Sequence, residues 1–197
     1  MSATATKVPG TAAEMPPWVV VGRHSFFGEA VQLRTWTPEE RIVIGSFCSV
    51  ADGASIMTGG HHRSDLPSTF PFDYYFLGRR RPHRTYMTTP DTTLGNDVWV
   101  GQQASICGGA RVGSGAVVAN RAVVMSDVPA YAVVAGNPAR VVRYRFSRPV
   151  IERLERIAWW DWPDEVIRQH VEWFYRPIQE FCDRFDPPAE ERARLDG

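Results

Sequence analysis

The stretch Leu94-Gly95-Asn96-Asp97-Val98-Trp99-Val100-Gly101 begins a six-residue pattern that continues to Pro129. Aliphatic residues stand at positions 94, 100, 106, 112, 118 and 124, and positions 98, 104, 110, 116, 122 and 128 hold alanine or valine. A fixed period this short is typical of a solenoid. Three sides of six residues would close a coil of about 18 residues, and successive coils would pair as parallel strands about 4.8 Å apart. We therefore predict an all-β solenoid.

The same pattern precedes this block and is interrupted twice. It begins at Val21 and resumes at Ile44, 23 positions later, and it stops at Ile56, 38 positions before Leu94. Neither interval is a multiple of six, so chain must leave the coil in both. A loop pushed out at a corner leaves the stack of coils intact and is free to carry function. We predict a short loop over residues 35–40 and a loop insertion over residues 57–93.

The two ends of the chain differ from the repeat in composition. Residues 1–15 are mostly small and polar, and we expect a disordered arm. Residues 16–146 then form the solenoid domain. Residues 147–182 change to a helical period, with Ser147 as the cap of a first helix and Pro163 at the start of a second. The charged residues 183–197 are expected to form a flexible tail.

The composition excludes several classes of protein. Lys and Arg number 22 and so do Asp and Glu, whereas nucleic-acid-binding proteins usually carry a basic excess. No apolar run reaches the roughly 20 residues of a membrane span, and no signal peptide is recognised. The three cysteines, Cys48, Cys107 and Cys182, give no disulfide framework, and the first two are expected to be small buried residues. We expect a cytoplasmic protein with no nucleic-acid or membrane partner.

The insertion contains the motif Gly59-Gly60-His61-His62-Arg63-Ser64-Asp65. An imidazole, with an ordinary pKa of about 6.5, can accept and return a proton near neutral pH. Asp65 could orient an imidazole through a carboxylate hydrogen bond, or it could cap a turn. By residue type alone, His62 would more readily be a surface loop histidine without a role.

Further motifs follow in a fixed order. They are Ser68-Thr69-Phe70-Pro71-Phe72, Leu94–Gly101, Asp127-Val128-Pro129-Ala130-Tyr131, Ala135-Gly136-Asn137-Pro138-Ala139-Arg140 and Trp159-Trp160-Asp161-Trp162. Together with the His61-His62 motif, this series resembles the hexapeptide-repeat xenobiotic acetyltransferases, which include the chloramphenicol and streptogramin O-acetyltransferases. The resemblance covers residues 18–175.

The resemblance implies a left-handed parallel β-helix with an extruded catalytic loop and a C-terminal α-helical segment. The left hand rests on the family alone, because parallel crossovers are generally right-handed. The family also implies a homotrimer with active sites between subunits, acetyl-CoA as co-substrate, no metal, and a small-molecule alcohol as acceptor. The catalytic base falls on His62, with His61 and Asp65 as supporting residues. The family commonly has Asn where His61 stands.

The remaining site residues also follow from the resemblance. Trp99 is expected near the thioester arm of CoA, and Gly136, Asn137 and Arg140 near its nucleotide end. Phe27 is expected in the acceptor pocket, in an aromatic pair that is often tyrosine in the family. Some of these have a structural alternative, since Trp99 could cover the coil, and Asn137 and Arg140 could be ordinary turn residues.

Three other functions remain open. A hexapeptide-repeat carbonic anhydrase would need three metal-binding histidines, whereas residues 94–129 contain none. A non-catalytic binding protein would not need the His62 loop. The same acetyl transfer could act on a sugar or natural-product alcohol, because the loop motif identifies the reaction better than the acceptor.

Overall fold

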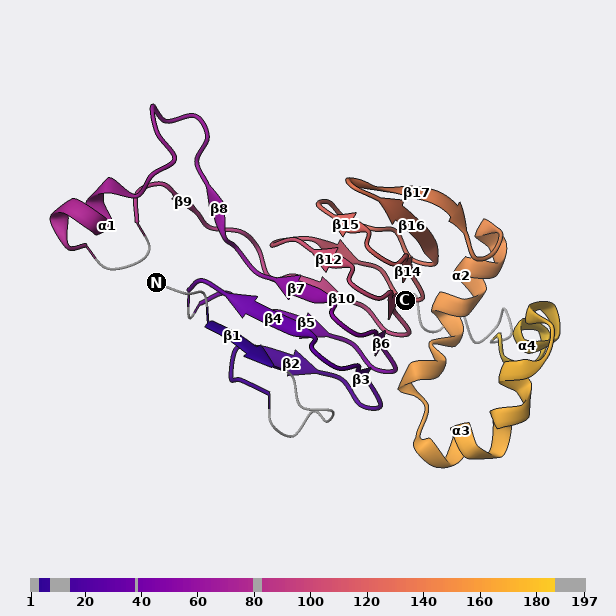
Figure 1. Ribbon diagram of the computed structural model, residues 1–197. Helices are drawn as coiled ribbons and strands as arrows, with labels where there is room; N and C mark the ends of the chain where they lie inside the picture. Colours follow the sequence, from indigo (N-terminus) through magenta and orange to yellow (C-terminus); the bar gives the residue numbers. More distant parts are fainter. Residues whose placement is uncertain (1–3, 8–14, 38, 80–82, 187–197) are drawn as a thin grey trace, which may run out of the picture. The chain divides into compact units, whose positions relative to one another are not determined.

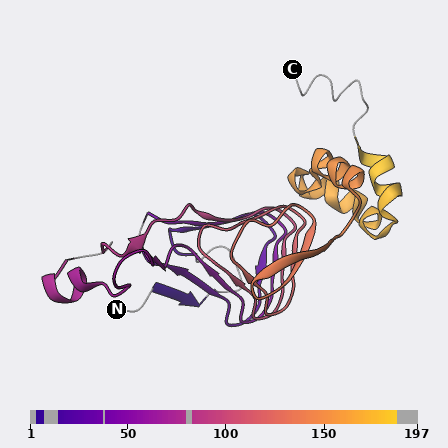
Figure 2. The ribbon, with the colours of Figure 1, turned by 90° about the horizontal axis from the view of Figure 1, so that it is seen from above.

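The computed structural model describes residues 4–7, 15–37, 39–79 and 83–186. The chain divides into two compact units, Met1–Arg143 and Tyr144–Gly197. The first unit is a coil of short strands that form three sheets (Figure 1), and its successive turns lie over one another (Figure 2). The second unit is helical. The predicted solenoid of parallel strands and its C-terminal helical segment are therefore confirmed.

The three sheets form the sides of the coil, and the strand pairs that stack successive turns are parallel. Sheet A has the order β1 (Thr4–Lys7), β4 (Gln32–Thr35), β7 (Ser55–Met57), β12 (Ser105–Ile106) and β15 (Val123–Val124). Sheet B has the order β13 (Arg111–Val112), β10 (Thr92–Leu94), β5 (Ile42–Ile44) and β2 (Val19–Val21). Sheet C has the order β17 (Ala139–Tyr144), β16 (Ala132–Gly136), β14 (Val117–Val118), β11 (Trp99–Val100), β6 (Ser49–Val50) and β3 (Phe26–Phe27).

The strand register agrees with the period in the sequence. Leu94 pairs with Val112, which lies 18 positions further along the chain. Val50 pairs with Val100, 50 positions further along, so 32 residues beyond the 18 of one turn lie in this interval. The insertion therefore leaves the stack of coils in register, as the sequence predicted.

The first turn of the coil extends further than the sequence pattern indicated. Val21 pairs with Ile44 and Leu33 with Ile56, and both pairs are 23 positions apart. The five residues in excess of 18 therefore lie after Leu33, where the loop over residues 35–40 was predicted. Phe27 and Leu33 continue the spacing of six from Val21, and both are buried.

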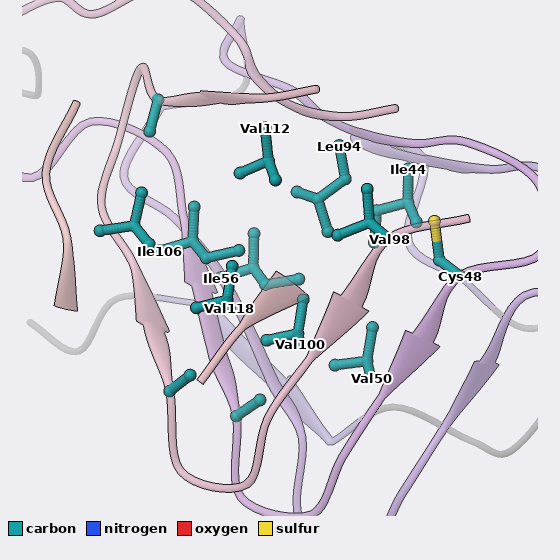
Figure 3. Packing of buried hydrophobic residues seen from close by; sticks show 14 of the residues in the cluster. Ile44, Cys48, Val50, Ile56, Leu94, Val98, Val100, Ile106, Val112 and Val118 are labelled. Carbon is teal, nitrogen blue, oxygen red and sulfur yellow. The ribbon is translucent and has the colours of Figure 1, made fainter. Parts of the chain in front are cut away.

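Two side chains from each six-residue unit fill the interior of the coil (Figure 3). They are the aliphatic residue that starts the unit and the small residue at its fifth position. Alternation along each short strand and the corner that precedes it brings both inward. At most 3% of the surface remains exposed for Ile44, Cys48, Val50, Ala54, Ile56, Leu94, Val98, Val100, Ala104, Ile106, Ala110, Val112, Ala116, Val118, Ala122 and Val124.

The expectation for the cysteines holds for Cys48 and only partly for Cys107. Cys48 is fully buried, and burial raises the pKa of its thiol. Cys107 is only half-buried, although burial raises the pKa of its thiol as well. Neither thiol is activated as a nucleophile, because a raised pKa lowers the thiolate fraction.

The insertion leaves the coil after β7 and returns at β10 (Figure 1). Its two arms pair as the antiparallel strands β8 (His61–His62) and β9 (Tyr86–Met87), with His62 opposite Tyr86. Helix α1 (Phe72–Leu77) lies between these arms. Since Met57 still belongs to β7 and Thr92 to β10, residues 58–79 and 83–91 lie outside the coil, and we call the segment 58–91 the excursion.

The helical unit contains α2 (Arg148–Ile157), η2 (Trp159–Asp161), α3 (Asp164–His170), η3 (Val171–Tyr175) and α4 (Ile178–Phe185). Ser147 occupies the N-cap position of α2 and Pro163 that of α3, at the two helix starts predicted from the sequence. Helices α2 and α4 pack together. No helix in the described part of the chain is long and apolar enough to cross a membrane.

The two ends of the chain depart from the sequence-based boundaries. Thr4–Lys7, inside the predicted disordered arm, forms β1 and pairs antiparallel with β4, while residues 1–3 and 8–14 lie outside the described residues. Helix α4 runs three residues into the predicted flexible tail, because Asp183 and Asp186 form ion pairs with Arg153 of α2. Residues 187–197 of that tail lie outside the described residues.

Candidate active site

The β8–β9 hairpin carries the histidine that the sequence predicts as the base. His62 is exposed on β8, and its Nδ1 lies 2.7 Å from the carbonyl oxygen of Thr69. A carbonyl oxygen can only accept a hydrogen bond, so Nδ1 carries the proton and donates it. In the neutral ring, Nε2 then keeps its lone pair. This geometry leaves Nε2 as the atom that can accept a proton.

His61 lies in a different environment from His62. Successive side chains of a strand point to opposite faces, so the ring of His61 cannot take the place of its neighbour. His61 is half-buried and pairs across the hairpin with Met87. The Thr69 carbonyl therefore orients one of the two adjacent imidazoles and not the other.

Asp65 forms an ion pair with Arg63. Nε and Nη2 of Arg63 donate to the two carboxylate oxygens of Asp65 at 3.0 and 2.5 Å. The hydrogen bonds from Arg63 lower the pKa of the Asp65 carboxyl, and the same contact raises the pKa of Arg63. Of the two roles left open for Asp65, the hydrogen bond to an imidazole is not formed: Asp65 binds Arg63, and a backbone carbonyl orients His62.

A buried polar cluster joins the excursion to the coil. Glu40 lies in the loop between β4 and β5 and is 2% exposed. One carboxylate oxygen accepts a hydrogen bond from the hydroxyl of Tyr86, and the other accepts one from Thr58 Oγ1 at 3.1 Å. Gly59 passes so close that a side chain there would collide with both Glu40 and Tyr86. This cluster fixes the start of β8 and the start of β9 to the same point of the coil.

His83, like Glu40, is a residue that the sequence did not single out. It is buried, and its ring centroid lies 5.0 Å from that of His62. The sequence carries no motif around it, and its residue type is the only signal. Glu40 gives a comparably weak signal, as a charged residue next to a break in the repeat.

Phe27 lies in the core and not in an acceptor pocket, so this prediction is wrong. It is 7% exposed and pairs with Val50 at an inward position of sheet C. Its neighbour Phe26 faces outward with 58% of its surface exposed, because adjacent strand residues alternate. The spacing of six from Val21 is the sequence signal that assigns Phe27 to the interior.

Trp99 faces outward from sheet C with 54% of its surface exposed. The register places it between Ser49 and Val117, and Phe26 lies on the far side of Ser49. The excursion that carries His62 continues from β7, which belongs to sheet A. Within one chain, Trp99 and His62 therefore belong to different sides of the coil.

The residues predicted near the nucleotide end of CoA lie at the turn between β16 and β17. Gly136 ends β16 with a φ of 97°, and the Asn137–Pro138 peptide bond is cis. Arg140 is exposed, and together with Asp127 it lines a hollow of about 260 Å³ at this end of the coil. The structure thus brings Gly136, Asn137 and Arg140 together in one exposed turn.

A second hollow, of about 360 Å³, lies within the excursion. Its polar groups include Asp73, whose carboxylate accepts a hydrogen bond of 2.9 Å from the backbone N–H of Arg84. This hydrogen bond, with a smaller contribution from the charge of His83, lowers the pKa of Asp73. Its apolar wall is formed by Leu66, Pro67, Phe70, Phe72 and Leu77. Within the described ranges, no group of three or more His, Cys, Asp or Glu residues could hold a metal ion.

Three matches with known proteins bear on the family of this chain. A family model described as bacterial transferase hexapeptide (six repeats) matches residues 91–125. A chloramphenicol acetyltransferase of Agrobacterium fabrum is 40% identical over 168 residues, which cover 77% of this chain and 79% of the relative. A virginiamycin A acetyltransferase of Staphylococcus aureus is 34% identical over 165 residues, which cover 78% of this chain and 75% of the relative.

A solved structure is similar as well. It is that of a hexapeptide-repeat acetyltransferase of Vibrio cholerae in complex with acetyl coenzyme A, with a TM-score of 0.52 and 27% identity. The match covers 66% of this chain and 62% of the Vibrio chain, so this chain spans less than two thirds of that protein. The two relatives described above establish the family, because their matches cover three quarters or more of this chain and of each relative. The chain belongs to the hexapeptide-repeat xenobiotic acetyltransferases, the family of the chloramphenicol and virginiamycin A acetyltransferases.

Proposed function

We propose that this protein is an acetyl-CoA-dependent O-acetyltransferase in which His62 is the general base that activates a hydroxyl of a small-molecule acceptor. The contact between Nδ1 of His62 and the Thr69 carbonyl carries this proposal. It favours the tautomer with the lone pair on Nε2, which a base needs. Family membership and the acetyl-CoA complex of the Vibrio relative support acetyl-CoA as the donor.

The reaction needs little from the protein beyond positioning and proton transfer. Nε2 of His62 takes the proton of the acceptor hydroxyl while the hydroxyl oxygen attacks the thioester carbonyl carbon. The tetrahedral intermediate then collapses, the carbon–sulfur bond breaks, and the imidazolium returns the proton to the departing CoA sulfur. The products are the acetyl ester and free CoA. General-base assistance of this kind typically accelerates a reaction by about 10²- to 10⁴-fold.

We further propose that the active site forms between subunits of a homotrimer of left-handed β-helices, as the family resemblance implies. Trp99 on sheet C and His62 on the excursion lie on different sides of one coil. A neighbouring subunit that presents its sheet C to the excursion would bring the two together across the thioester arm. Arg140, exposed at the end of sheet C, would then suit a CoA phosphate.

The excursion favours an acceptor with an apolar or aromatic body. Phe70, Phe72 and Tyr75 expose between 42% and 60% of their surface, and Phe70 forms ring contacts with the other two. The hollow of about 360 Å³ lies against Phe70 and Phe72. Chloramphenicol and virginiamycin A, the compounds named for the two relatives, have hydroxyl groups on such bodies, whereas a free sugar would gain little from this surface.

The test is a thiol-release assay with acetyl-CoA and a panel of chloramphenicol, virginiamycin A and simple sugars. Wild-type protein should release CoA with at least one apolar alcohol. His62→Ala should reduce kcat by about 10²- to 10⁴-fold, while His61→Ala should retain kcat within about tenfold. A faster reaction with a sugar would favour the alternative acceptor class. Equal activity of wild type and His62→Ala would refute the base assignment, and failure to bind acetyl-CoA would favour a non-catalytic binding protein.

A further inference from the structure

The environment of His62 contains a second imidazole whose placement the reaction as described does not use. His83 is 9% exposed, although it lies in the excursion, where many neighbours are in solvent. Its ring meets that of His62 edge-on, with centroids 5.0 Å apart and planes at 63°. His62 itself is exposed. An exposed ring on a two-residue strand needs contacts on more than one side to hold one orientation.

The Thr69 carbonyl supplies only one such contact. A single hydrogen bond at Nδ1 fixes the distance of that atom from the carbonyl oxygen, but it leaves the ring free to swing about the bond. The ring of His83 blocks this swing on one side, since the two rings are in edge contact. The carbonyl and the second ring together define the plane of the His62 imidazole and hence the direction of Nε2.

His83 is itself held by contacts that lead back to the coil. Its Nδ1 and Thr85 Oγ1 form a hydrogen bond of 2.7 Å, and Thr85 is 6% exposed. Its carbonyl oxygen accepts a hydrogen bond of 2.9 Å from the backbone N–H of Tyr86, and the two rings meet edge-on at 5.9 Å. The hydroxyl of Tyr86 donates to the buried carboxylate of Glu40. A continuous series of contacts therefore runs from the coil to the predicted base.

We propose that His83 is a positioning residue for the His62 imidazole, and that the series Glu40, Tyr86 and His83 transmits the rigidity of the coil to the base. This proposal rests on the proposed function of His62. His83 touches neither the acceptor nor acetyl-CoA in this role and transfers no proton. It holds the base at the angle from which Nε2 can reach an acceptor hydroxyl. Misplacement of a reacting group by about 1 Å can cost about 10²-fold in rate.

The experiment compares His83→Ala and His83→Phe in the full-length protein, with His24→Asn as the matched control. His24 is an exposed histidine at a corner of the coil, outside the excursion. We measure kcat and KM for acetyl-CoA with chloramphenicol, or with whichever panel alcohol gives the fastest turnover. His83→Ala should lower kcat by about 10- to 100-fold and leave KM for acetyl-CoA within about twofold. His83→Phe should recover most of the loss, because it restores the ring edge, and His24→Asn should match the wild type.

A spectroscopic measurement separates this proposal from that of the base. In protein labelled with ¹⁵N-histidine, the ring nitrogen shifts of His62 report which nitrogen carries the proton, and the line widths of these signals report whether the ring moves. The wild type and His83→Phe should give the Nδ1–H form with sharp signals. His83→Ala should keep that form, because the Thr69 carbonyl remains, but its signals should broaden as the ring swings. This result needs no turnover, so it stands even if His62→Ala is fully active and the proposed function fails. Unchanged His62 line widths or an unchanged kcat in His83→Ala, or a kcat for His83→Phe no higher than that for His83→Ala, would overturn the positioning role.

Discussion

The hydrogen bond between the hydroxyl of Tyr86 and Glu40 offers the sharpest test of how the excursion is held. Tyr86→Phe removes the hydroxyl and keeps the ring. Glu40 is 2% exposed, so water cannot readily replace the lost donor, and Thr58 Oγ1 remains as a partner of the other oxygen. A hydrogen bond to a charged group contributes about 1.5–3 kcal/mol. We expect the substitution to destabilise the paired β8–β9 hairpin, relative to its opened form, by a free energy in this range.

The loss should be local, because the excursion can open without unfolding the coil. The backbone N–H of Arg63 donates to the Thr85 carbonyl at 2.7 Å within the hairpin, and the N–H of Cys107 donates to the Val124 carbonyl at 2.9 Å between two turns of the coil. Native-state hydrogen exchange reads both amides. A loss of 1.5–3 kcal/mol corresponds to about 10- to 150-fold faster exchange of the Arg63 amide. The Cys107 amide should exchange as in the wild type.

Tyr75→Phe is the matched control for this measurement. Tyr75 lies on α1 in the same excursion and is 60% exposed, so the loss of its hydroxyl removes no buried contact. The control should change the exchange of the Arg63 amide by less than about twofold. If Tyr86→Phe and Tyr75→Phe gave the same exchange rates, the Glu40 cluster would not be what holds the excursion to the coil. If both hairpin and coil amides accelerated equally, the bond would stabilise the whole unit and not the hairpin.

Two further predictions concern the coil and the helical unit. Gly101→Ala should destabilise the protein by about 1–3 kcal/mol in urea unfolding, since a Cβ there would lie 2.6 Å from the backbone N of Asn120 in the next turn. Gly78 is the comparison, because a Cβ there would meet open space and its φ is 61°. Gly78→Ala should therefore cost only the backbone strain of about 1 kcal/mol. The hydrogen bond from Arg156 lowers the pKa of Asp186 in the folded state. The ionised carboxylate therefore stabilises the fold fully above the ordinary pKa of about 3.9, and this stabilisation is lost as the pH falls through the lowered pKa. Asp186→Asn should therefore unfold more easily than the wild type at pH 7 and lose less stability in acid, as read by tryptophan fluorescence. Equal acid profiles of the variant and the wild type would contradict a stabilising ion pair.

The coil was predictable because its information is local and repeated. Spacing of six and the small fifth residue specify which side chains point inward, and the register between Leu94 and Val112 follows. The same rule assigns Phe27 to the core, so that error came from a family expectation that overrode the spacing. The corners were less readable. Gln103 and Arg121 adopt positive φ values of 58° and 60° without being glycine, and no residue-type preference announces this conformation.

The site was predictable only where a motif marked it. His62 was found through its motif, whereas the Thr69 carbonyl that orients it is a backbone atom that no sequence pattern names. The bond from Tyr86 to Glu40 joins residues 46 positions apart, across the whole root of the excursion. Contacts of this kind exist only after the coil has brought both segments together. The sequence left Asp65 open between orienting an imidazole and capping a turn, and the structure pairs its carboxylate with Arg63, two positions away.

The coil and the excursion are stabilised by different interactions, and this difference bears on function. No member of the described hydrophobic core cluster lies between Met57 and Leu94, so the excursion gains little from apolar burial. Polar contacts hold its root instead: Thr92 Oγ1 donates to the Met57 carbonyl at 2.6 Å, and the N–H of Gly59 donates to Thr89 Oγ1 at 3.0 Å. Hydrogen bonds of this type are directional and fail within fractions of an ångström, whereas apolar packing yields gradually. Substitutions in the coil interior should therefore lower stability before they lower activity, and substitutions at the root of the excursion should do the reverse.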